Sequence, residues 1–560
     1  MNPRFLYLGK VAAKVIAAAS VLVLCVAVQA QSVSTSTDPV ALARAALGAE
    51  RGMAAVGVWR QGAATYGFAQ NGTPVSAVVA TPLQQPLFEI GSISKVFTGV
   101  LVAQAVEQGD LALSDTLGKL LQGKVSVTSP EVAAITLQQL LTHSSCLPRQ
   151  YGTSLNGAAV VAQIREDDRV KLWEALASQT MEKAPPCVAL YSNYGFAVLG
   201  ELLSDRYGKP WDELVRERIT GPLGMSDTVV TLGDKTARFA PPFDGALQAP
   251  VWDMKAFVGA GGLRSTPHDM LLFGRAILAG KDGPLGAAAV KLVASLGSYE
   301  GGQIGHAIFV VGPPDKMSFS HDGLTGGYRT LLTLYPDTHE VMVALVSNRQ
   351  APMGQLGTEL WASRYPVRGT PVPVAEQTLN DYTGVYRVNP ELAFTVVRQD
   401  DTLFVRSTRN AFNGYIPVDR DVFTRPAGGA QITFIRNAGK VSALRLEQGG
   451  RTIMAGRTGE PAPSRATLPN GAAAGLAGTY RATRFLRNAI ELNVRVERGQ
   501  LAVKSSNFPR LQVYPVAGQT DRFYYEAVKA ELQFERDAEG RANILVLHEN
   551  GVHRLERVAD

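Results

Sequence analysis

The chain has few of the residue patterns that mark several common classes of protein. Only three cysteines occur among its 560 residues, and no group of His, Cys, Asp and Glu has the spacing of a metal site. The formal net charge is only +6, and no cluster of Lys and Arg is interleaved with aromatic residues. Beyond the N-terminus, no apolar run reaches the length of a membrane span. We therefore expect no metal, no cofactor, no nucleic-acid partner and no integral membrane segment in the mature protein.

The N-terminus has the features of a signal peptide. Three basic residues come first, an apolar run covers 15–28, and the sequence VQA at 28–30 offers the small residues that signal peptidase needs. A membrane anchor is the alternative, but the run is short for a bilayer. The pattern predicts a signal peptide over 1–30 and a periplasmic or secreted protein. Removal of Cys25 with that peptide would leave two cysteines in an oxidising compartment.

The first large part of the chain, 38–365, reads as one mixed α/β unit. Helical periodicity is clear over 94–108. Apolar or alternating runs predict strands over 54–59, 307–311, 328–335 and 340–346. Strands near both ends with helices between them predict a sheet in which the two ends of this unit meet, with a helical region inserted.

Two repeated segments follow this unit, each after a linker. The linkers, 366–378 and 459–474, are rich in Pro. LNDYTGVYRV after the first linker lines up with LAGTYRA after the second, and further matches recur at a period close to 100 residues. Short alternating strands predict a small antiparallel barrel or sandwich in each copy, at 379–458 and 475–558.

The first candidate catalytic motif is the tetrapeptide Ser92-Ile93-Ser94-Lys95. A Ser and a Lys three positions apart lie on one face of a helical turn. Ser92 is a poor nucleophile without a base, and Lys95 can be that base if burial lowers its pKa. A capped helix start with a surface lysine is the alternative.

A second motif, Tyr191-Ser192-Asn193, places a phenol and an amide on the same side of an extended or turn segment. Tyr191 would relay a proton to the leaving group, and Asn193 would hold a substrate amide. The alternative is a core tyrosine followed by an Asn cap at the start of a helix.

The third motif is a Lys or His followed two residues later by Gly, on a strand beside the nucleophile. Lys281-Asp282-Gly283 follows a helical run and reads as a turn, so we choose His321-Asp322-Gly323, which precedes the strand over 328–335. Gly323 would let a substrate backbone approach the strand closely, and His321 would supply a donor whose charge varies near neutral pH.

Together these residues resemble a known family. FEIGSISK at 88–95 is similar to the active-site octapeptide of class C β-lactamases, and YSN and HDG match the other two motifs of the penicillin-recognising serine enzymes. Further likeness lies in ITLQQLLTHSSCLP (135–148), ITGPLGMSDT (219–228) and GAGGLRSTPHDM (259–270). The resemblance implies an α/β (α+β) β-lactamase/transpeptidase-like fold, with an antiparallel sheet flanked by helices and a helical subdomain. The C-terminal copies resemble lipocalin-like barrels.

The resemblance also implies roles for individual residues. Ser92 is the acylated nucleophile, Lys95 the base and Tyr191 the proton shuttle. The substrate-binding residues are the acyl-amide ligand Asn193, the third-motif residues His321 and Gly323, and Leu324, whose backbone N–H forms the oxyanion hole with that of Ser92. His321 takes the place of the usual Lys and would face the substrate carboxylate.

Cys146 and Cys187 stand where relatives often have Gly, in segments that border the active site of the family. Two such replacements are easier if they occurred together. We therefore expect a disulfide between Cys146 and Cys187.

The resulting expectation is a secreted serine acyl-hydrolase that cleaves the amide of β-lactams or D-Ala-terminated peptides through a Ser92 acyl-enzyme. An esterase or D-aminopeptidase of the same family is the alternative. A penicillin- or peptide-binding protein without turnover is a third reading, from a different class. The partner is a small-molecule or peptide substrate, and the sequence leaves the oligomeric state open.

Overall fold

The computed structural model describes most of the chain after residue 37. The expected signal peptide, the first part of the first linker (366–371) and most of the second linker lie outside the described residues. The described residues are 38–71, 73–74, 84–151, 157–181, 184–187, 190–299, 302–312, 316–353, 372–389, 392–399, 402–407, 413–425, 430–448, 451–460, 471–473, 475–485, 488–497, 500–505, 508–516, 519–525, 530–548 and 552–558.

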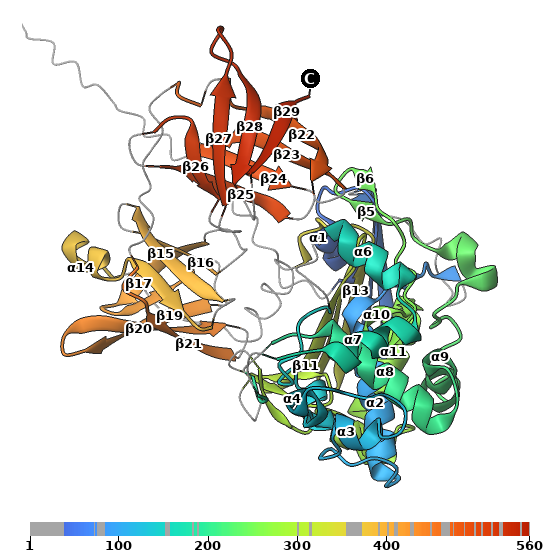
Figure 1. Ribbon diagram of the computed structural model, residues 1–560. Coiled ribbons are helices and arrows are strands. Elements are labelled where there is room, and N and C mark those ends of the chain that lie inside the picture. Colours follow the sequence, from blue (N-terminus) through green and yellow to red (C-terminus); the bar gives the residue numbers. More distant parts are fainter. Residues whose placement is uncertain are drawn as a thin grey trace, which may run out of the picture. The chain divides into compact units, whose positions relative to one another are not determined.

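A nine-stranded antiparallel sheet forms the centre of the first unit (Figure 1). Its order is β3-β2-β1-β13-β12-β11-β10-β9-β8, so an early strand, β1 (Met53–Arg60), pairs with the late strand β13 (Glu340–Val346). This pairing confirms the predicted meeting of the two ends of the unit. The other strands are β2 (Ala63–Gln70), β3 (Thr73–Pro74), β8 (Gly297–Tyr299), β9 (Gly302–Ile304), β10 (Phe309–Val311), β11 (Ser318–Leu324) and β12 (Arg329–Tyr335).

Both faces of the central strands are covered. On one face Val56 packs in a cluster with Leu47 of α1 (Pro39–Leu47). On the other face Val343 joins the large cluster that contains Phe273 of α11 (Pro267–Leu278). A strand buried on both faces carries an unbroken apolar sequence, which explains the run EVMVALV in β13.

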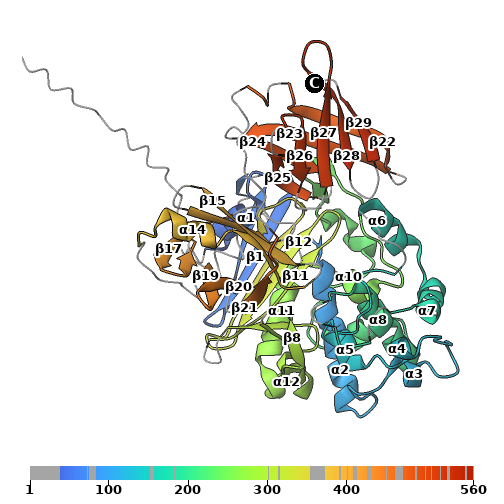
Figure 2. The ribbon, with the colours of Figure 1, turned by 60° about the vertical axis from the view of Figure 1, so that its left-hand side comes forward.

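A helical layer lies beside this sheet, and α2 (Ser94–Glu107) runs through its centre. Figure 2 shows α2 together with α8 (Asn193–Tyr207) and α10 (Val258–Gly261), which contact one another. Glycines permit the close contact of α8 and α10, because a Cβ on Gly259 would lie 3.1 Å from the Cα of Gly200. The other α-helices of this unit are α3 (Leu117–Leu120), α4 (Pro130–Ala133), α5 (Leu137–Leu141), α6 (Gly157–Glu166), α7 (Arg169–Ser178), α9 (Trp211–Val215) and α12 (Ala287–Val293).

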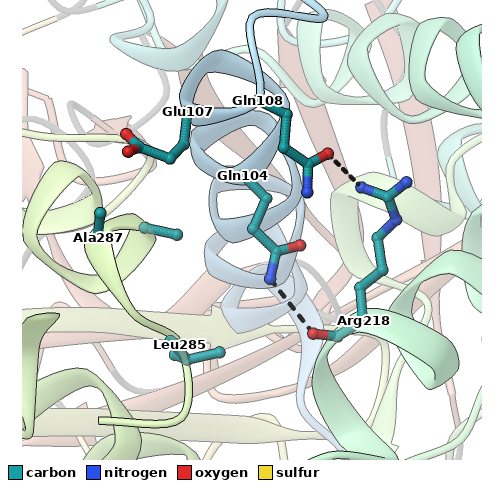
Figure 3. Close-up of a pocket in the computed structure, with 7 residues that line it drawn as sticks. Gln104, Glu107, Gln108, Arg218, Leu285 and Ala287 are labelled. Carbon is teal, nitrogen blue, oxygen red and sulfur yellow. Dashed lines mark hydrogen bonds between the residues drawn. The ribbon is translucent and has the colours of Figure 1, made fainter. Parts of the chain in front are cut away.

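A cavity of about 300 Å³ lies at the C-terminal end of α2 (Figure 3). Gln104 donates a hydrogen bond to the carbonyl of Arg218 there, and the Arg218 guanidinium donates one to the side-chain oxygen of Gln108. The helix rises about 1.5 Å per residue, so this cavity is roughly 20 Å from the N-terminal end of α2. It is therefore separate from the residues of the three motifs.

Each C-terminal copy forms a closed eight-stranded barrel. The first consists of β14 (Gly384–Arg387), β15 (Ala393–Gln399), β16 (Thr402–Ser407), β17 (Asn413–Asp419), β18 (Val422–Thr424), β19 (Ala430–Asn437), β20 (Lys440–Gln448) and β21 (Arg451–Arg457), and α14 (Glu376–Asp381) precedes it. The second consists of β22 (Gly478–Phe485), β23 (Asn488–Glu497), β24 (Gln500–Ser505), β25 (Phe508–Pro515), β26 (Arg522–Tyr525), β27 (Ala530–Arg536), β28 (Ala542–His548) and β29 (Val552–Arg557).

The two barrels repeat the same internal contacts. In the first, Arg436 pairs with Asp421 at 2.8 Å, and in the second Arg536 pairs with Asp521 at 2.7 Å. Phe434 and Phe534 each belong to the core of their own barrel. These equivalent pairs support the duplication that the sequence predicts.

Among the residues that the structure describes, no helix combines the length and the apolar character needed to cross a membrane.

Candidate active site

Ser92 lies at a sharp turn between a strand and a helix. The chain leaves β4 (Phe88–Glu89), turns at Gly91 with φ +53°, and passes through a 3₁₀ turn (Gly91–Ile93) into α2. A Cβ on Gly91 would lie 3.0 Å from the amide nitrogen of Leu324. Glycine is required here both by the left-handed conformation and by this close approach, which sets Ser92 beside the end of β11.

Lys95 is fully buried on the first turn of α2. Its Nζ lies 3.0 Å from Oγ of Ser92, 2.8 Å from Oδ1 of Asn193 and 2.6 Å from the carbonyl oxygen of Ala260. Burial holds the pKa of Lys95 well below its ordinary value, and the positive charge of Arg149 lowers it further. In its neutral form the amine could donate two hydrogens to Asn193 and Ala260 and direct its lone pair at the hydroxyl of Ser92, whereas the ammonium form would donate to all three oxygens. The arrangement is therefore compatible with the role of base expected for Lys95.

Tyr191 supplies a second group to the same serine. Its hydroxyl is hydrogen-bonded to Ser92, and burial raises its pKa. The phenol is therefore protonated at neutral pH and can donate a proton, whereas a phenolate is disfavoured. Lys95 Nζ is 5.0 Å from the centre of the Tyr191 ring, so the three side chains form one compact group.

The ring of His143 packs against the ring of Tyr191. The two ring centres are 4.2 Å apart, and Nδ1 of His143 accepts a hydrogen bond from the backbone N–H of Ser192 at 3.1 Å. Burial holds the pKa of His143 well below its ordinary value, so the ring is neutral. The sequence alone gave no signal for this supporting role, which depends on tertiary contacts.

The segment that carries Tyr191 is attached to the segment after α5. The backbone N–H of Cys187 donates to the carbonyl of Ser144 at 2.8 Å, and that of Leu190 donates to the carbonyl of His143 at 3.1 Å. The structure confirms the predicted disulfide between Cys146 and Cys187, whose Cα atoms are 5.1 Å apart. Cys146 has φ +62°, a left-handed conformation that favours glycine.

Asn193 begins a helix, contrary to the extended or turn segment expected for this motif. It is the first residue of α8, and the side chain of Ser192 caps the helix by accepting a hydrogen bond from the N–H of Gly195. Ser192 is therefore the capping residue of α8, and its hydroxyl also donates a hydrogen bond to the carbonyl of Pro148. Asn193 is thereby left to bind Lys95.

His321 lies on β11 and is almost completely buried. Only 1% of its surface is exposed, and its ring centre is 5.0 Å from that of Phe309. Burial lowers the pKa of His321 to about 4, so the imidazolium expected from the sequence does not form near neutral pH. Nδ1 lies 2.7 Å from the carbonyl oxygen of Asp322 and donates to it, which leaves Nε2 as an acceptor without a partner among the described residues.

Gly323 is required for packing within the protein. A Cβ there would lie 2.1 Å from the carbonyl oxygen of Ile90, which accepts a hydrogen bond from the hydroxyl of Thr330. The close approach expected between Gly323 and a substrate is therefore made by the chain's own backbone just before the nucleophile. This packing brings the N–H of Leu324 next to the turn at Ser92.

Glu89, three residues before Ser92, is a buried carboxyl group that sequence reasoning missed. Its side chain accepts a hydrogen bond from the N–H of Trp252 at 2.7 Å and lies 3.8 Å from the Arg264 guanidinium. Burial raises the pKa of Glu89 to about 7. Its contacts connect the strand before the nucleophile to the loop that precedes α10.

Within the described ranges, no three His, Cys, Asp or Glu side chains gather as a metal site would require. A serine in contact with a buried lysine of lowered pKa and with a protonated tyrosine is a combination that can support acyl transfer through a covalent intermediate.

The model of the family described as Beta-lactamase matches residues 41–364, which is more than half of the chain. The chain belongs to the beta-lactamase family. Its beta-lactamase domain holds all three motifs, and both barrels follow the matched region.

Known members and solved structures are similar to parts of this beta-lactamase family chain. The D-alanyl-D-alanine-carboxypeptidase/endopeptidase AmpH of Escherichia coli (strain K12) is 34% identical over 192 residues, which cover 34% of this chain and 48% of AmpH. The chain thus spans about half the length of that relative. Penicillin-binding protein 4 of Amycolatopsis lactamdurans is 29% identical over 285 residues, covering 47% of this chain and 72% of that protein. The structure of a beta-lactamase/D-alanine carboxypeptidase from Yersinia pestis has a TM-score of 0.49 at 22% identity, covering 60% of this chain and 98% of that one.

Proposed function

We propose that this protein is a serine acyl-hydrolase of the class C β-lactamase/penicillin-binding type, which hydrolyses an amide through an acyl-enzyme on Ser92. The observation that carries the proposal is the position of Lys95. A buried amine with a lowered pKa is hydrogen-bonded to Asn193 and Ala260, and lies 3.0 Å from Oγ of Ser92. A structural lysine would need no such environment.

Acylation follows from these contacts. Oγ of Ser92 attacks the substrate carbonyl while its proton passes to Nζ of Lys95. The negative oxygen of the tetrahedral intermediate accepts hydrogen bonds from the N–H groups of Ser92 and Leu324. Tyr191 donates its proton to the leaving nitrogen as the carbon–nitrogen bond breaks, and the proton held by Lys95 replaces it.

Deacylation uses the same groups in reverse order. Water attacks the ester carbonyl of the acyl-enzyme, and its proton passes through the Tyr191 hydroxyl to Lys95, which is neutral again after the first step. The bond between Oγ of Ser92 and the acyl carbon breaks, and Oγ recovers a proton from Lys95. The free acid leaves, and the enzyme returns to its starting state.

The relatives support D-Ala-terminated peptides and β-lactams as the substrate class. AmpH is named a D-alanyl-D-alanine-carboxypeptidase/endopeptidase, and the Amycolatopsis relative is named a penicillin-binding protein. The N-terminal sequence favours action in the periplasm or outside the cell.

An esterase or D-aminopeptidase is the second candidate, and one observation favours it. The third motif contains His321 in place of a lysine, and burial lowers the pKa of that histidine to about 4. A substrate that has no carboxylate next to this motif does not need a positive charge at position 321, so its binding is not weakened by the neutral histidine.

The test is mass spectrometry of the protein after incubation with a penicillin, beside an assay of D-Ala release from a D-Ala-D-Ala peptide. We expect a mass increase equal to the acyl group, located on Ser92, and none in Ser92→Ala. An adduct that persists in Ser92→Ala would refute the assignment of the nucleophile. A stoichiometric Ser92 adduct that never hydrolyses, with no peptide or ester turnover, would instead identify a binding protein.

A further inference from the structure

Arg149 is an exposed cation at the edge of the catalytic group. Its backbone carbonyl accepts hydrogen bonds from the N–H groups of Asn193 and Tyr194, at 3.0 and 3.2 Å. Its side chain is exposed, and Cζ lies 4.9 Å from the centre of the Tyr191 ring. The backbone of Arg149 is therefore fixed to the second motif while its guanidinium faces solvent beside the phenol.

No carboxylate among the described residues forms an ion pair with Arg149. Other arginines of the same unit are paired, as Arg238 is with Asp227 and Arg60 with Glu340 at 2.5 Å. The charge of Arg149 nevertheless reaches the reacting groups, because it lowers the pKa of both Lys95 and Tyr191. A cation so close to the nucleophile, with its donors unused by carboxylates, is free to bind an anionic substrate group.

The third-motif strand offers different groups to a substrate. On β11, the ring of His321 donates through Nδ1 to the carbonyl of Asp322 and offers only a lone pair at Nε2. The Asp322 side chain is exposed on the same strand. His321 therefore offers no cation to a substrate carboxylate, and the charge of the partly buried Arg329 on the neighbouring strand already acts on Asp322.

We propose that Arg149 binds a carboxylate on the acyl portion of the substrate, and thereby selects acyl groups that carry a negative charge. The inference rests on the proposed function. We assign the carboxylate to the acyl side because the carbonyl of Arg149 is hydrogen-bonded to the backbone of Asn193, the residue assigned to the acyl amide. The guanidinium also lies beside the Tyr191 ring, so the ester with its acid on the leaving group tests this assignment directly. The planar guanidinium matches a carboxylate with two parallel hydrogen bonds, which a lysine at this position would not reproduce.

The test compares a neutral ester, an ester with a carboxylate on the acyl side and an ester with a carboxylate on the leaving group. Each variant is compared with the wild type on the same ester, so that differences in leaving-group reactivity between the esters cancel. The three esters are 4-nitrophenyl hexanoate, the mono-4-nitrophenyl ester of hexanedioic acid, which carries the acid on the acyl side, and the hexanoyl ester of 4-hydroxybenzoic acid, which carries it on the leaving group. The full-length proteins are wild type, Arg149→Gln, Arg149→Lys and the control Arg216→Gln, which removes an exposed arginine of η3 (Arg216–Thr220). Circular dichroism checks that each variant is folded.

We expect the ratio of kcat/KM for the acyl-side acid to kcat/KM for the neutral ester to fall at least about tenfold in Arg149→Gln, mainly through KM. Arg149→Lys should recover part of the ratio, and Arg216→Gln should not change it. Added salt should lower the wild-type ratio and have little effect on that of Arg149→Gln.

Equal losses on all three esters would overturn the proposal, because they would assign Arg149 to the support of Tyr191 alone. A selective loss on the leaving-group acid would overturn the acyl-side assignment. Absence of any Ser92 acyl-enzyme in the wild type would refute the proposed function first, and the inference with it. An intact acyl-enzyme with an unchanged ratio would refute only the role of Arg149.

Discussion

The disulfide between Cys146 and Cys187 should stabilise the catalytic unit without being needed for the chemistry. It closes a loop with a sequence separation of 41 residues. In the chain-entropy model, a loop of this length contributes about 4 kcal/mol at 25 °C. We therefore expect Cys146→Ser/Cys187→Ser to lose stability by up to that amount.

The activity of the same variant should fall by much less, by under about tenfold in kcat. Backbone hydrogen bonds from Cys187 and Leu190 to Ser144 and His143 still hold the segment that carries Tyr191. Tyr191 thus keeps its position while the native state lasts. The disulfide limits the unfolded chain more than it shapes the folded site.

The assay is loss of ester hydrolysis with increasing urea, measured for the oxidised wild type, the reduced wild type and the double variant. Following activity reports on the catalytic unit alone, which matters because the chain has several units. A useful companion is Cys146→Gly/Cys187→Ser, which should recover about 1 kcal/mol because position 146 has φ +62°. Loss of all activity on reduction, with an unchanged urea midpoint, would refute the reasoning.

Three further predictions concern the site. Gly91→Ala should reduce kcat/KM at least about a hundredfold, because the added Cβ would lie 3.0 Å from the amide nitrogen of Leu324 and displace it. A loss of less than about fivefold in ester hydrolysis would contradict the role of this close approach. The pKa of Glu89 is raised from 4.5 to about 7, so the folded state binds the extra proton and stability should decline as pH rises from 4.5 to 7, by about 3 kcal/mol at most. Urea midpoints measured across this range should show the decline in the wild type and lose it in Glu89→Gln, and the same slope in both would exclude Glu89 as its source. Burial lowers the pKa of His321 to about 4, so the ring should stay neutral between pH 5 and 8. The ratio of kcat/KM for leaving-group acids to kcat/KM for neutral esters should therefore be constant over this range, in the wild type and in His321→Gln. A fall in the wild-type ratio centred near pH 6.5, absent in His321→Gln, would show that the ring is charged in this range.

The sequence predicted the helix that follows Ser92 and the central sheet because each has a clear local apolar pattern, as in the run VMVALV of β13. The spacing of Ser92 and Lys95 is a weak signal on its own, and their assignment as nucleophile and base came from the combination with the other two motifs and stays a prediction. The disulfide was also predictable, since Cys146 and Cys187 are the two cysteines that remain after the expected signal peptide.

What the sequence did not predict depends on burial and on distant contacts. The charge of His321 follows from its surroundings on β11, which no local pattern describes. Glu89 and His143 become important only because Trp252 and Tyr191 are brought to them by the fold. Asn193 was placed in an extended or turn segment because both Ser192 and Asn193 are good helix-capping residues, and the sequence does not show that Ser192 takes the cap.

The turn at Gly91 has a consequence for the order in which this protein is made. Ser92 and Lys95 leave the ribosome early, but the backbone of Leu324 that completes their surroundings is synthesised far later, and β13 must still follow before β1 has its partner. A nascent or truncated chain that ends before these strands would hold the proposed nucleophile without the second of its proposed oxyanion donors. If the proposed mechanism holds, hydrolytic activity depends on completion of the whole catalytic unit, and a partly synthesised chain should react much more slowly.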